Sequence, residues 1–93
     1  MIVKNGTSTE GLASRTANYL RGEGIDVVGE SNADQVTSAC TIIDYTGKPY
    51  TIQYLANLCK TENSRVLNRY DPTSQVDVEF VVGTLFAESN SLP

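Results

Sequence analysis

Two polar turns, each placed just before an expected helix, carry the residues that could bind a ligand: Asn5-Gly6-Thr7 and Thr46-Gly47-Lys48. The start of a helix presents free backbone N–H groups and a partial positive charge, and so attracts anions and hydrogen-bond acceptors. If both turns lie on one edge of the sheet, Asn5, Gly6, Thr7 and Lys48 would form a binding site for an anionic or hydroxyl-rich polymer. The alternative is that Asn5-Gly6-Thr7 only makes a tight turn and caps the helix.

The two cysteines could form one disulfide. Cys40 begins an expected strand, and Cys59 ends the helix expected after it. A strand and the helix that returns beside it run antiparallel, so these two ends should approach each other. In an oxidising compartment the bond would close a loop of about 20 residues and stabilise the fold by roughly 3 kcal/mol. The alternative is two buried thiols that pack as small apolar side chains.

The composition lacks one residue that enzymes commonly use for catalysis. The chain has no His, which removes the usual general base near neutral pH and the commonest metal ligand. Two cysteines without histidine partners are too few for a zinc site. Asp77 and Glu79 lie two apart, but such carboxylates are ordinary on the outward face of a strand. We therefore predict no catalysis, no cofactor and no metal.

The charge and hydropathy pattern exclude two further classes of partner. The net charge is −4, and the seven Lys and Arg residues are scattered along the 93 residues. An acidic chain without a basic stripe is a poor partner for nucleic acid, whose phosphates must be neutralised by Lys and Arg. No apolar run approaches the roughly 18 residues that a membrane span needs, so we expect no membrane insertion by this chain itself.

Hydrophobic periodicity predicts one α+β domain over residues 1–87, followed by a frayed tail at 88–93. Strands are expected at 2–4, 25–29, 40–45 and 76–82, with a short edge strand at 65–70. Helices are expected from about residue 8 and over 49–60. The first helix should bury one stripe, consisting of Leu12, Ala13, Thr16, Ala17 and Leu20.

These elements predict a two-layer sandwich with both helices on one face of a small sheet. A ferredoxin-like β-α-β-β-α-β order would make the strands at 2–4 and 40–45 parallel neighbours, because such crossovers are right-handed. The two polar turns would then converge on the same edge of the sheet.

The two ends of the chain resemble the C-terminal (LytR C) domain of the LytR-CpsA-Psr cell-envelope proteins. That family opens with a strand, then Asn-Gly-Thr, three variable residues and Gly-Leu-Ala, as in Asn5-Gly6-Thr7 and Gly11-Leu12-Ala13. It ends in a run similar to residues 77–86 here, with Leu85 in place of an acidic residue. The resemblance extends from Ile2 to Phe86.

The resemblance implies a non-catalytic, extracytoplasmic accessory module of a bacterial cell-envelope protein, so that this chain would be an excised domain of a membrane-anchored parent. We expect it to bind peptidoglycan or an anionic wall polymer, or to position the parent enzyme. The alternative is a protein–protein interaction or oligomerisation module with no glycan ligand, in which the edge strand at 65–70 pairs with another chain.

Overall fold

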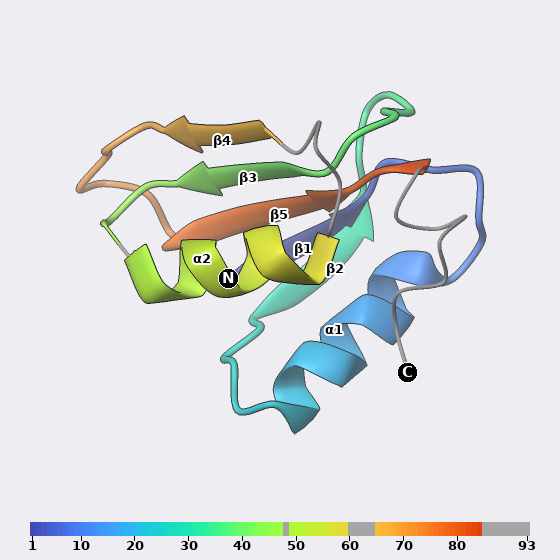
Figure 1. Cartoon of the computed structure of the whole chain (residues 1–93), viewed down its shortest axis with the longest axis horizontal. Helices are drawn as coiled ribbons and strands as arrows, with labels where there is room; N and C mark the ends of the chain where they lie inside the picture. The colour runs from blue at the N-terminus through green and yellow to red at the C-terminus, as the bar shows by residue number, and fades with distance from the viewer. Residues whose placement is uncertain (48, 60–64, 85–93) are drawn as a thin grey trace.

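The computed structural model describes residues 1–47, 49–59 and 65–84. Within these residues, five strands form one mixed sheet and two helices pack on one face of it (Figure 1). In chain order the elements are β1 (Ile2–Asn5), α1 (Leu12–Gly22), β2 (Gly29–Asn32), β3 (Thr41–Asp44), α2 (Pro49–Cys59), β4 (Arg65–Asn68) and β5 (Val78–Val82). The order across the sheet is β2-β1-β5-β3-β4.

The chain builds two similar units, one on each side of β5. In each unit a strand of 4 residues leads into a helix of 11 residues and then into a parallel strand, giving β1-α1-β2 and β3-α2-β4. β5 lies between the units, parallel to β1 and antiparallel to β3. Because both connections are right-handed and the two units run in opposite directions, their helices cover the same face (Figure 1).

The core lies between the sheet and the helices. Val3, Phe80 and Ile42 are neighbours in the strand register and are fully buried. Burial of such side chains is the main favourable contribution to folding. The stripe predicted on α1 is confirmed, since all five of its residues are buried: Leu12, Ala13, Thr16, Ala17 and Leu20.

A pair of tyrosines joins the two helices. Tyr19 of α1 and Tyr54 of α2 both pack against the core. Burial raises the pKa of Tyr54 to about 12, and the hydrogen bond with Tyr19 adds to the shift. The phenol therefore stays neutral at ordinary pH, and it links the two units on the helix side of the sheet.

The mixed αβ class, the two layers and the edge strand at β4 are confirmed, but the ferredoxin-like order does not hold. The neighbours of β1 are β2 and β5, whereas β3 pairs with β5 and β4. The connection through α1 returns directly beside β1, and β5 takes the other side of that strand. The turns that follow β1 and β3 therefore lie at opposite ends of the sheet.

The starts of β2 and α1 differ most from the sequence prediction. β2 is the polar run Gly29–Asn32, whereas a strand was expected at 25–29. An edge strand that is mostly exposed needs no apolar side chains, and Val27 is buried outside it in irregular chain. α1 begins at Leu12 because a side-chain-bonded turn occupies the preceding residues. The predicted tail at 88–93 lies outside the described residues.

Three segments of the chain meet where β1 and β5 end. The Gly6 N–H donates to the Val82 carbonyl at 2.9 Å, and the Gly6 carbonyl accepts from the Thr37 N–H at 2.7 Å. A Cβ on Gly6 would lie 2.8 Å from the Val82 oxygen, and one on Gly83 would lie 2.5 Å from backbone atoms of Ala39. Neither position has room for a side chain, because segment 37–39 lies against both glycines.

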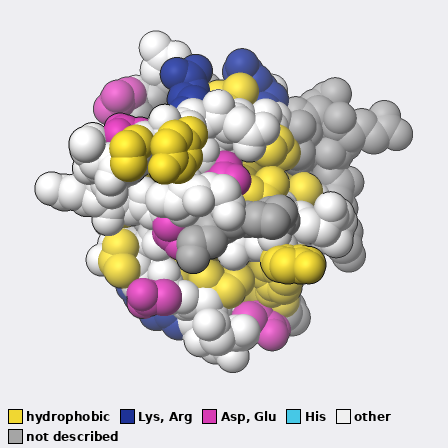
Figure 2. Space-filling model, turned by 90° about the vertical axis from the view of Figure 1, so that its left-hand side faces the viewer, with side chains coloured by type: hydrophobic (Ala, Val, Ile, Leu, Met, Phe, Trp, Pro, Cys, Tyr) yellow, Lys and Arg dark blue, Asp and Glu magenta, His cyan; other side chains and the backbone are white. Residues whose placement is uncertain are grey.

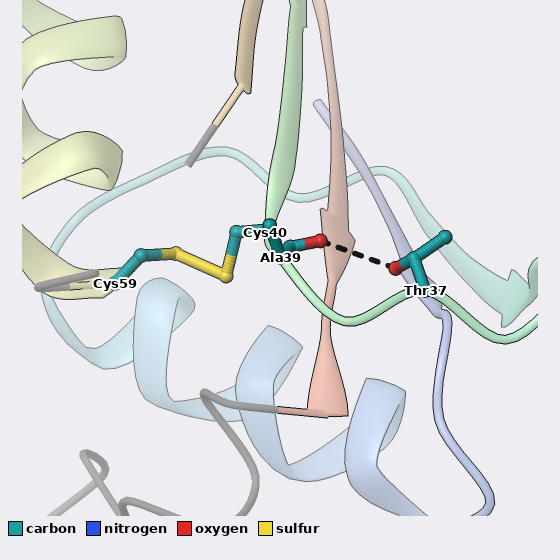
Figure 3. The surroundings of a disulfide bond; sticks show 4 residues. All are labelled: Thr37, Ala39, Cys40 and Cys59. Carbon is teal, nitrogen blue, oxygen red and sulfur yellow. Dashed lines mark hydrogen bonds between the residues drawn. A yellow bond between two sulfur atoms is a disulfide. The ribbon is translucent and has the colours of Figure 1, made fainter. Parts of the chain in front are cut away.

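A disulfide joins Cys40, just before β3, to Cys59, the last residue of α2 (Figure 3). Both side chains are fully buried, and their Cα atoms are 6.6 Å apart. The Thr37 hydroxyl donates to the Ala39 carbonyl at 3.2 Å on the other side of Cys40. Segment 37–39, which contacts Gly6 and Gly83, is therefore also held to α2 through the disulfide at Cys40.

We expect Gly83→Ala to lower the free energy of unfolding by about 3 kcal/mol or more, since its Cβ would overlap backbone that cannot move aside. Gly22→Ala is the matched control. Nothing lies within 4 Å of the Cβ that it adds to α1, so up to about 1 kcal/mol of stabilisation is expected. Denaturant unfolding compares the two variants, and a Gly83→Ala chain as stable as the unchanged one would contradict the close approach.

Removing the disulfide with a Cys40→Ala/Cys59→Ala double variant should lower the free energy of unfolding by about 3 kcal/mol, because the unfolded chain regains the freedom of the closed loop. Reductant should have the same effect on the unchanged chain and none on the double variant. Thiol labelling of the unfolded, unreduced protein provides an independent check: two reactive thiols would show that the bond is absent.

Candidate functional site

An open pocket of about 240 Å³ lies where β1 and β2 end and α1 begins. Because β1 and β2 are parallel, their carboxyl ends share one edge of the sheet. Ligands of α/β proteins bind preferentially outside the carboxyl ends of strands. The pocket is lined by small and polar residues: Asn5, Gly11, Ala13, Ser14, Glu30, Ser31 and Asn32.

Asn5 shapes the turn that leads into the pocket. Its Oδ1 accepts hydrogen bonds from the Thr7 N–H at 2.9 Å and the Thr7 hydroxyl at 2.6 Å. Its Nδ2 donates to the Thr9 carbonyl at 2.7 Å. The side chain is buried, so these bonds replace water that it has lost. The Asn-Gly-Thr motif therefore makes a turn, as the simpler sequence alternative proposed.

The helix that follows this turn has no side-chain cap. Gly11 occupies the N-cap position with φ of 77°, a left-handed conformation that favours glycine, and no side-chain hydrogen bond caps the helix. Thr7 bonds Asn5 and Thr9 instead of the first turn of α1. The predicted cap does not form, and Ala13 and Ser14 of the first turn line the pocket.

Glu30 gives the pocket an acidic character. Its carboxylate accepts a hydrogen bond from the Ser14 hydroxyl and lies 3.5 Å from the Arg21 guanidinium. A carboxylate in the pocket opposes an anionic ligand, and it accepts hydrogen bonds from hydroxyl groups. Ser31 and Asn32 add neutral polar groups beside it. The arrangement suits a neutral ligand that is rich in hydroxyls.

Of the four predicted ligand-binding residues, Asn5 lines the pocket, while Gly6 and Thr7 lie in the adjacent turn. Lys48 lies outside the described residues. Gly47, which precedes it, follows β3 at the opposite end of the sheet, because β1 and β3 run antiparallel. The expected convergence of the two turns on one edge is therefore wrong.

Sequence reasoning missed Ser14 and the β2 residues of the pocket. Residues 31–38 read as a polar connection, because their side chains carry no apolar alternation. No sequence pattern marks them. They belong to the pocket because β2 is an exposed edge strand that pairs in parallel with β1.

The carboxylates at the start of β5 are used in ion pairs. Asp77 Oδ1 lies 2.8 Å from the Met1 amino nitrogen, and Glu79 Oε1 lies 3.1 Å from Lys4 Nζ. Burial raises the pKa of Asp77, but the hydrogen bond and charge of the Met1 amino group outweigh it and leave that pKa below its usual range. Across the described part of the chain, no group of three His, Cys, Asp or Glu side chains could hold a metal ion.

Comparison with protein families identifies a matching family model. Residues 2–86 match the model LytR_C, described as LytR cell envelope-related transcriptional attenuator. A search of curated proteins and a search of solved structures returned no significant match. None of the described helices has the length and apolar character that a membrane crossing requires.

We expect Asn5→Ala to lower the free energy of unfolding by about 2 kcal/mol, because it removes the three hydrogen bonds with which this buried side chain holds the turn. Asn5→Asp keeps the acceptor oxygen, so its free energy of unfolding should fall by less. Thermal and denaturant unfolding measure both changes. If Asn5→Ala were as stable as the unchanged chain, the side chain would not be holding the turn.

Proposed function

Because this chain belongs to the family described as LytR cell envelope-related transcriptional attenuator, we propose that it is a non-catalytic accessory module of a bacterial cell-envelope protein and that it binds wall glycan. The supporting observation is the open polar pocket beside α1. The module would act on the extracytoplasmic side and hold its parent protein against the wall.

The chemistry of the pocket favours sugar hydroxyls. Glu30, Asn32 and the Ser14 oxygen offer acceptors, and Ser31 and Asn32 offer donors. With about 240 Å³ the pocket is smaller than the roughly 300–1,000 Å³ of pockets for drug-sized ligands, so it suits one sugar unit of a longer chain. This favours the hydroxyl-rich part of a wall polymer over its anionic groups. A ligand role for Lys48 stays a prediction.

The motifs at the two ends of the domain have structural roles. Asn5 and Gly6 hold the first turn by hydrogen bonds, and the lack of a side chain at Gly83 lets segment 37–39 pack against it. These family motifs are thus explained by the fold. The description of the family as a transcriptional attenuator requires no DNA contact by this chain, and a net charge of −4 opposes binding to phosphates.

Co-sedimentation with purified bacterial sacculi tests the proposal. The chain should sediment with sacculi, and a Ser31→Ala/Asn32→Ala variant should bind about tenfold more weakly, because it loses two sets of hydrogen bonds to the sugar. Both side chains are exposed, so their removal should leave the fold intact. Gln53→Ala is the matched control, since it removes an exposed amide from α2, away from the pocket.

Sacculi stripped of their covalently attached polymers identify the ligand. Binding that survives stripping points to peptidoglycan, and binding that is lost points to the attached polymer. No sedimentation with either preparation would reject glycan binding and favour a protein-interaction module.

A further inference from the structure

The outer edge of β4 presents unpaired backbone groups. The Arg65 N–H donates to the Cys40 carbonyl and the Arg69 N–H to the Asp44 carbonyl, each at 2.9 Å, so odd-numbered residues direct their backbone groups toward β3. The N–H and C=O groups of Val66 and Asn68 therefore point away from the sheet. No strand among the described residues pairs with this edge. It can accept a further strand.

This edge is basic in an otherwise acidic chain. Arg65 and Arg69 are exposed, and neither forms an ion pair within the described residues, whereas Lys4 and Arg21 each do. Figure 2 shows Lys and Arg side chains along the top of the molecule, on the side of β4. Two free guanidinium groups beside an open strand edge favour a partner with carboxylates.

The side chains of β4 differ between its two faces. Val66 pairs with the buried Ile42 and so lies on the helix side, where 42% of it remains exposed. Arg65 and Leu67 pair with Thr41 and Ile43, so they lie on the open side of the sheet. A strand added at this edge would meet an apolar neighbour on one face and positive charge on the other.

A second copy of the chain does not fit this edge. In antiparallel self-pairing, the outward groups of both residues are used when Val66 of each copy lies opposite Asn68 of the other. In that register Arg65 of each copy lies directly opposite Arg69 of the other copy. Like charges directly opposite each other destabilise a strand pair. Charged residues on edge strands act against self-association in the same way.

We propose that β4 binds an extended acidic segment of a partner protein by strand addition. Acidic side chains of that segment lie opposite Arg65 and Arg69, and apolar side chains alternate with them beside Val66. The backbone bonds to Val66 and Asn68 provide affinity, and the alternation of side chains provides specificity.

Amide hydrogen exchange, followed by NMR on the full chain, tests the proposal. The probes are two capped synthetic peptides, one of alternating Glu and Val and one of alternating Lys and Val. At millimolar concentration the Glu-Val peptide should slow exchange of the Val66 and Asn68 amides, and the Lys-Val peptide should not. No slowing at these two amides, or equal slowing by both peptides, would overturn the proposal.

Two variants make the test specific. Arg65→Glu/Arg69→Glu should bind the Glu-Val peptide about tenfold more weakly and should now prefer the Lys-Val peptide. Val66→Pro removes an outward N–H without removing a bond to β3, so it should lose binding of the Glu-Val peptide while the rest of the amide spectrum is retained. Unchanged binding of the Glu-Val peptide by either variant would also overturn the proposal.

Discussion

The whole fold depends on β5, which lies between the β1-α1-β2 and β3-α2-β4 units and is the strand through which their sheets are joined. β5 is parallel to β1 on one side and antiparallel to β3 on the other. Its side chains Val78, Phe80 and Val82 are fully buried beneath both helices. Without this strand, β1 and β3 would each keep an open edge, and the two helices would cover separate, smaller cores. The single hydrophobic core therefore requires β5.

The two units share one kind of turn after their first strand, although their sequences there differ. β1 and β3 each end in a buried polar residue, Asn5 and Asp44, whose side chain accepts hydrogen bonds from the backbone two residues on. Such a turn carries the chain from strand to helix in both units. The residues that follow differ, so a search for sequence repeats finds nothing. In the first unit, β2 supplies Glu30 and Asn32 to the pocket.

Local pattern was enough to predict much of the fold. The α1 stripe followed from helical periodicity, the start of α2 followed from Pro49, and β4 was expected as an edge strand. β2 was misplaced because an exposed edge strand is held by backbone bonds and carries no hydrophobic signal. The strand order could not be read from the chain, because it depends on whether β5 or β3 occupies the place beside β1. That error carried into the site, where Lys48 had been expected beside Asn5.

The position of β5 in the chain has a consequence for synthesis. It is the central strand of the sheet and yet the last of the described strands to leave the ribosome. Until it emerges, the preceding residues expose two strand edges and an unfilled core, which is the state in which polypeptides aggregate most readily. The sheet therefore cannot be completed until β5 has been made.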